Sequence, residues 1–217
     1  MPAKNNREYR DMVLEVVIDE EQPEEEREER KTVAGYASTF DDPYVLYEDE
    51  DLIYREQVDR RAFDDTDMSD VIMQYDHSGR VFARISNNTL RVNPDAKGLF
   101  VEADLGGTEI GRELYDEIRG GYTDKMSFGF IVSADEELRT RAEDGRVDIL
   151  RTITGISKLF DVSAVSIPAN NATSISVQTR SRIDGVIEEV RAERLEAEKV
   201  ELERRRAEVR AKALGKE

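Results

Sequence analysis

The chain of 217 residues contains no cysteine, one histidine and no long apolar run. Without thiols it cannot form disulfides, use a cysteine nucleophile or bind an iron–sulfur cluster through cysteine, which fits a reducing compartment. No segment approaches the roughly 20 apolar residues of a membrane-spanning helix, and the N-terminal phrase MPAKNNREYR has no apolar stretch. We therefore expect a soluble, cytoplasmic protein with no membrane contact.

Basic residues are scarce relative to acidic ones. The chain has 32 Lys and Arg against 49 Asp and Glu, a formal net charge of -17. Binding to a phosphate backbone requires a concentrated basic surface. The charge therefore argues against a nonspecific nucleic-acid binder, and we expect no direct contact with nucleic acid.

Short segments of alternating apolar and polar residues dominate the first 180 residues. Candidate strands are YRDMVLEVVID, TVAGYASTF, DVIMQYDH, VFARI, TLRVN, GLFVEADL, DKMSFGFIV, DILRTITGI, KLFDVSAVSI and TSISVQT. Because most follow one another through turns and not through helices, we expect a mostly antiparallel sheet. The second candidate is a possible partner of the first, and the acidic run between them, residues 19–31, is interpreted as a solvated loop.

Helical signals are few. Thr108 is a plausible N-cap, apolar residues recur at four-residue intervals from Ile110 to Ile118, and Gly120–Gly121 should end that helix. The phrase DRRAFDD is a further short helical candidate. The sequence thus predicts a domain over residues 1–180 and a charged helical extension over 181–217, either a solvated or weakly partner-binding helix or a coiled coil.

Three residues could together form a nucleophilic site. In MSFGF, Ser127 faces away from its bulky neighbours; His77 ends an alternating strand just before the turn signal Ser78–Gly79; and Asp161 lies on a strand face with Leu159. A hydroxyl becomes a good nucleophile when an imidazole accepts its proton and a third group orients that imidazole. The pattern alone leaves open whether these residues meet.

A calcium site is one alternative. Asp65, Asp67, Ser69 and Asp76 occupy positions 1, 3, 5 and 12 of a calcium-loop template, with apolar Ile72 at position 8. The template's glycine is replaced by an aspartate, and its last glutamate by the shorter Asp76. A calcium-stabilised binding module therefore remains a weaker hypothesis.

Several phrases together point to a known family. GYASTFD, QYDH, GLFVEADL, the helix end IRGG, MSFGF and LFDVSAVSIPAN resemble, in the same order, the prohead proteases of tailed bacteriophages, over roughly residues 31 to 178. These serine proteases are related in fold to the herpesvirus assemblins and mature capsids by cleaving scaffold and capsid proteins. The resemblance implies an α+β fold with a small, mostly antiparallel β-barrel and peripheral helices.

The resemblance also implies roles for single residues. Ser127 would be the nucleophile, His77 the general base and Asp161 the third member, where many relatives carry Glu and the assemblins a second histidine. Apart from the resemblance, Ala169 and Asn170 are candidate oxyanion donors because they follow the Asp161 strand in a turn and Pro168 has no N–H to offer. No cofactor or metal is required. The expected substrates are the major capsid protein, scaffold segments and the protease itself, inside the assembling prohead in the host cytoplasm; self-association is left open. A catalytically inactive assembly or scaffolding protein with the same fold is the alternative.

Overall fold

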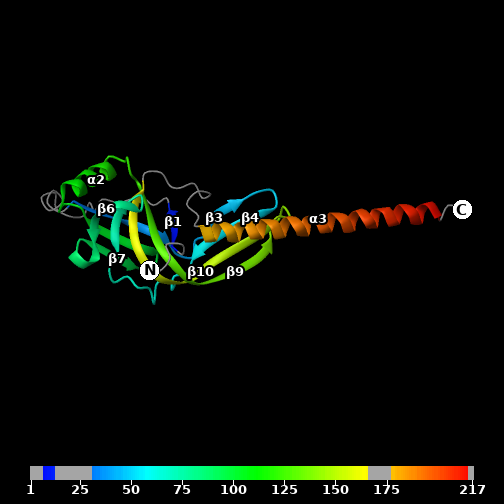
Figure 1. Ribbon diagram of the computed structural model, residues 1–217, viewed down its shortest axis with the longest axis horizontal. Coiled ribbons are helices and arrows are strands. Elements are labelled where there is room, and N and C mark those ends of the chain that lie inside the picture. Colours follow the sequence, from blue (N-terminus) through cyan, green and yellow to red (C-terminus); the bar gives the residue numbers. More distant parts are fainter. Residues whose placement is uncertain (1–6, 13–30, 166–176, 215–217) are drawn as a thin grey trace.

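The computed structural model describes residues 7–12, 31–165 and 177–214. Figure 1 shows a body built mainly of β-strands, with α2 at one end and the long helix α3 projecting from the other. The elements in chain order are β1 (Glu8–Met12), β2 (Thr32–Thr39), β3 (Tyr44–Glu48), β4 (Leu52–Val58), β5 (Ile72–Tyr75), β6 (Ser78–Arg84), the 3-10 helix η2 (Ile85–Asn87), β7 (Leu90–Pro94), β8 (Gly98–Asp104), α2 (Glu109–Arg119), β9 (Lys125–Arg141), β10 (Val147–Val165) and α3 (Val177–Leu214).

The strands form two sheets. The larger sheet runs β1–β9–β10–β4–β3, with β5 also paired to β10 and β6 paired to β5; the smaller runs β2–β8–β7. Of the eight described pairings, only β10–β4 and β10–β5 are parallel. The prediction of a mixed, mostly antiparallel α+β fold is confirmed. The pairings among the described residues do not close a barrel, so the barrel remains a prediction.

Strand partners differ from expectation at the N-terminus. Among the described residues the suggested pairing of the first two candidate strands is not found: β2 pairs with β8, and β1 pairs antiparallel with β9, placing Asp11 opposite Ser127. Residues 13–19 of the first candidate strand lie outside the described part. Alternation tells which face of a strand is apolar but not which strand lies beside it. Of the expected acidic loop at 19–31, only Lys31 is among the described residues.

The main apolar core lies against both sheets and α2. Met126, Phe128 and Phe130 of β9 pack in it with residues from β2, β5, β8 and β10. The predicted helix is confirmed as α2, whose N-cap Thr108 accepts a hydrogen bond from the Gly111 backbone N–H at 3.1 Å. By contrast, DRRAFDD forms turns instead of a helix. The buried apolar residues of this segment pack in the main core, although they do not recur at helical spacing.

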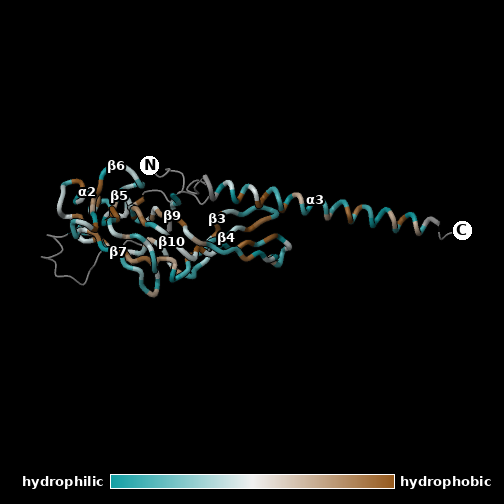
Figure 2. Tube along the Cα trace, turned by 60° about the horizontal axis from the view of Figure 1, so that its bottom comes forward, coloured by the Kyte–Doolittle hydropathy of each residue, from teal (hydrophilic) through white to brown (hydrophobic). Residues whose placement is uncertain are grey.

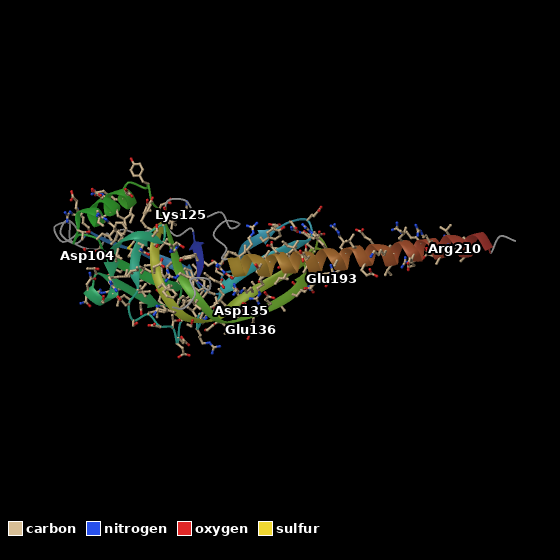
Figure 3. The ribbon with its side chains drawn as sticks, viewed as in Figure 1. Asp104, Lys125, Asp135, Glu136, Glu193 and Arg210 are labelled. Carbon is tan, nitrogen blue, oxygen red and sulfur yellow. The ribbon has the colours of Figure 1, made fainter. Side chains whose placement is uncertain are left out.

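The first half of α3 packs on the body, and the second half projects from it. Ile183 and Val190 are buried in a second apolar cluster with residues of β3, β4 and β10. Figure 2 shows hydrophilic and hydrophobic residues mixed along the projecting part, and Figure 3 places Arg210 far from the sheets. The helix begins at Val177, so the end of the predicted strand TSISVQT is helical; residues 173–176 lie outside the described part.

Four charged side chains meet in the interior beside β1. Arg10 donates hydrogen bonds to Glu56 and Glu8, and Arg151 donates to the same two carboxylates. Burial alone would raise the pKa of the Glu8 carboxyl, but Arg10 and Arg151 outweigh it and hold that pKa below its usual value. Removing one member of a buried ion pair costs about 3–5 kcal/mol, since the opposite charge is left uncompensated. The cluster therefore fixes β1 through its side chains.

The same cluster reaches the C-terminal helix. Asp135 on β9 accepts hydrogen bonds from both Arg151 and Arg182 of α3. Figure 3 shows Asp135 close to the first turns of α3. Burial would raise the pKa of the Asp135 carboxyl, but the two guanidinium groups lower it below its usual value. A continuous set of charged contacts thus joins α3 to β1.

Candidate active site

Ser127 lies in the middle of the large sheet. Its neighbours Met126 and Phe128 point into the apolar core, so strand alternation directs Ser127 to the opposite face, as predicted. The side chain is fully buried, at 0% exposure. Its hydroxyl lies 2.6 Å from Nε2 of His77 and 2.9 Å from the carbonyl oxygen of Arg10 on β1.

His77 is held in a tight turn. The sequence predicted that it ends a strand before a turn at Ser78–Gly79; instead β5 ends at Tyr75, β6 begins at Ser78, and Asp76 and His77 are the two turn residues. Both have positive φ, 46° and 53°, as a two-residue type I′ hairpin requires. Left-handed backbone costs energy for residues other than glycine and is concentrated at functional sites.

Ser163 fixes this turn to β10. Its hydroxyl oxygen accepts the backbone N–H of His77 at 3.2 Å and donates to Oδ1 of Asp161 at 3.1 Å. The neighbouring N–H of Asp76 donates to the carbonyl of Ala164 at 3.1 Å. The imidazole is therefore positioned by contacts to β10 as well as by its own turn.

Asp161 reaches the face of Ser127 through a β-bulge. The sequence placed it on one face with Leu159, but Leu159 pairs with Phe130 on the core side while Asp161 pairs with Gly129, because the register shifts between them. An extra residue in a strand reverses the alternation beyond it. The expected face was therefore wrong, and the bulge at Phe160 aims the carboxylate at His77.

The three predicted residues meet in one hydrogen-bonded chain. Nδ1 of His77 contacts Oδ1 of Asp161, and Nε2 lies 2.6 Å from the Ser127 hydroxyl. When Nδ1 donates its proton to the carboxylate, Nε2 is left as an acceptor facing Ser127. The shorter side chain of Asp161 thus reaches the imidazole directly. Under the inactive-protein alternative His77 and Ser127 need not touch, so that alternative does not explain the contact between them.

Gly129 makes room for the carboxylate. A Cβ atom there would stand 2.5 Å from Oδ2 of Asp161 and 2.9 Å from Cε1 of Tyr9. Oδ2 is buried without a hydrogen-bond donor among the described residues, and Nη1 of Arg7 lies 3.6 Å from it. The glycine in MSFGF is therefore needed beside Asp161 and Tyr9.

If Ser127, His77 and Asp161 act together in peptide cleavage, as the sequence predicts, Gly129→Ala should lower the rate of cleavage by about 100-fold, since displacing a catalytic group by about 1 Å has effects of that size. The new methyl group would push the Asp161 carboxylate away from His77. Steady-state cleavage kinetics and a thermal melt of the same preparation would measure this. Gly107→Ala is the matched control, because a Cβ at Gly107 meets no atom within 4 Å. Equal activity of the two variants would contradict the assignment.

The remaining predicted site residues are the oxyanion candidates and those of the calcium hypothesis. Ala169 and Asn170 lie outside the described residues, so the oxyanion donors stay a prediction. In the described ranges, no group of three or more His, Cys, Asp or Glu could hold a metal ion. Asp67 of the calcium hypothesis forms an ion pair with Lys158 and accepts a hydrogen bond from Ser69.

Sequence reasoning missed the residues around the predicted triad. Ser163 had one signal, since it follows Asp161 by two residues and so shares its strand face. No local pattern pointed to Tyr9 or Arg10, because β1 and β9 lie more than 100 residues apart in the chain. The ring centroid of Tyr9 lies 4.4 Å from that of His77. Long-range strand pairing leaves no local pattern to detect.

Comparison with protein families places the chain beside a known one. The family model described as caudovirus prohead serine protease matches residues 18–185. Neither a curated protein nor a solved structure matches the chain. Strand β1 lies before the matched segment, which contains His77, Ser127 and Asp161. No helix in the described part is long and apolar enough to cross a membrane.

Proposed function

The chain belongs to the family of caudovirus prohead serine proteases, and from this premise we propose that it is an endopeptidase that cuts capsid and scaffold proteins during prohead maturation. The observation that carries this proposal is the 2.6 Å contact between Nε2 of His77 and the Ser127 hydroxyl, with Asp161 on the other ring nitrogen. Two hydrogen-bonded contacts in series are the arrangement that activates a serine.

The mechanism we propose is acyl transfer through an ester of Ser127. The hydroxyl oxygen attacks the scissile carbonyl carbon while Nε2 of His77 takes its proton, and Asp161 stabilises the resulting imidazolium. His77 then gives that proton to the leaving amine, which releases the first product. A water molecule, deprotonated by His77, attacks the ester and restores Ser127. Ala169 and Asn170 remain candidate N–H donors to the oxyanion.

The proposed site of action is the assembling prohead in the host cytoplasm. Substrates would be the major capsid protein, scaffold segments and the protease itself. Coexpression with the cognate capsid protein, followed by gel electrophoresis and mass determination of the products, tests the proposal. Shortened capsid protein should appear with the wild-type chain and not with Ser127→Ala; identical products from both would refute the proteolytic function.

We further propose that the projecting part of α3 directs the protease into the prohead by contact with scaffold helices. Its apolar side chains Val200, Leu202 and Val209 are exposed beyond the part that packs on the body. Removing residues 198–217 should reduce packaging into proheads several-fold while leaving cleavage of a soluble peptide unchanged, because Ile183 and Val190 keep their contacts. Quantitative blotting of purified proheads measures packaging. Unchanged packaging would contradict this role.

A further inference from the structure

Strand β1 covers the edge of β9 that carries Ser127. Residues Glu8 to Met12 pair with Phe130 to Met126, so the backbone of β9 is hydrogen-bonded on both sides, to β1 and to β10. Without β1, this part of β9 would be an edge strand, which offers its free N–H and C=O groups to any extended peptide. The family match begins at residue 18, beyond β1. The covering strand thus lies before the segment that the family model matches.

The contact of β1 with Ser127 works against its activation. The hydroxyl has one proton and two neighbouring acceptors, Nε2 of His77 at 2.6 Å and the carbonyl oxygen of Arg10 at 2.9 Å. A proton donated to the carbonyl is not available to the imidazole. The side chain of Ser127 is also fully buried, so a substrate carbonyl has no route to it while the chain is arranged in this way.

Side chains of β1 and the residue before it engage the rest of the site. The Tyr9 ring lies against His77, and Arg7 is paired with Oδ2 of Asp161. On the other face of the strand, Arg10 is bound to Glu56 in the buried charge cluster. Each member of the predicted triad is therefore contacted by the same short segment.

We propose that the edge of β9 from Met126 to Phe130 is the peptide-binding edge of the protease, and that β1 is its intramolecular occupant. An extended segment of the substrate polypeptide binds there as an antiparallel strand once β1 has left. This inference rests on the proposed function. It adds that β1 blocks the peptide-binding edge in the folded enzyme, and that the contact between Arg10 and Glu56 keeps β1 in place.

A reversible staple tests whether β1 must leave. Met12 and Met126 are opposite residues in the β1–β9 pairing, and opposite Cα atoms in antiparallel strands lie about 4.5–5.5 Å apart, within the range of a disulfide. Because the chain has no cysteine, Met12→Cys/Met126→Cys introduces its only thiols. The full-length variant is oxidised or reduced, and Ser127 is labelled with a fluorophosphonate reagent that reacts with activated serines.

We expect labelling and peptide cleavage to be about 100-fold slower in the oxidised form, because the staple suppresses local opening of β1, and to recover on reduction. The matched control is Ala34→Cys/Glu102→Cys, at opposite residues of β2 and β8 in the smaller sheet. Its labelling and cleavage rates should be the same in the oxidised and reduced forms. Equal rates for oxidised and reduced Met12→Cys/Met126→Cys would overturn the inference. Ser127→Ala in the same background separates the two proposals: undiminished labelling there would instead remove Ser127 as the nucleophile.

A second measurement uses the anchor of β1. Arg10→Gln removes the charge that faces Glu56, and the full chain should then be labelled about tenfold faster, since losing a buried charge contact mainly speeds dissociation. Arg10→Lys keeps the positive charge but lacks the bidentate geometry of the guanidinium. Its labelling rate should therefore lie between those of the wild-type chain and Arg10→Gln. Labelling of Arg10→Gln could instead be slower than that of the wild-type chain, with the rate restored in Arg10→Lys. That result would show that β1 supports the site and does not block it, and it would overturn the inference.

Discussion

Ser127→Ala and His77→Ala are each expected to lower kcat for a peptide substrate by about 10⁶-fold. Losses of this size follow when one member of a serine–histidine pair that acts as a unit is removed. The loss corresponds to about 8 kcal/mol of activation free energy. Without the hydroxyl no ester can form, and without the imidazole the hydroxyl keeps its proton. Steady-state kinetics on a soluble peptide measures both variants.

The double variant sharpens this prediction. Because the two side chains share one proton, Ser127→Ala/His77→Ala should be no slower than either single variant. Ser133→Ala, a serine farther along β9 and outside the chain of contacts, is the matched control and should retain full activity. Losses that add in the double variant would mean that His77 and Ser127 act separately, contrary to the proposed mechanism.

Asp161→Asn is expected to lower kcat by about 10⁴-fold while leaving the fold intact. The amide can donate to Nδ1 of His77, which would place the ring proton on Nε2, where it faces Ser127 and cannot accept the hydroxyl proton. The amide also carries no charge to stabilise the imidazolium. Kinetics across the pH range, with near-ultraviolet circular dichroism to check the fold, measures the effect.

A smaller effect would change the assignment of the third residue. A decrease of only a few-fold in Asp161→Asn would mean that another group orients His77. Ser163→Ala is the comparison variant, since it removes one hydrogen bond to Asp161 and one to the His77 backbone but leaves the carboxylate in place. Ser163→Ala should lower kcat far less than Asp161→Asn does if the charge of Asp161 is its main contribution to catalysis.

Local patterns in the sequence predicted several elements correctly. The alternation in MSFGF placed Ser127 on the face opposite Phe128, and Thr108 with the residues after it predicted α2 and its cap. These features depend on neighbours two to four residues apart, which is the repeat of a strand or a helix. The same reasoning failed at Asp161, because a bulge changes the face of every residue after it and leaves no mark in the alternation.

The sequence by itself determined the residue types of the proposed site, the faces of the regular strands and the family phrases in their order. Only the tertiary structure decided that His77 lies in a left-handed turn pinned by Ser163, that the bulge brings Asp161 beside Gly129, and that Arg10 of β1 reaches Ser127. Each of these depends on pairing between strands distant in the chain, where register and partner are selected by the packing of the whole fold and not by local propensity.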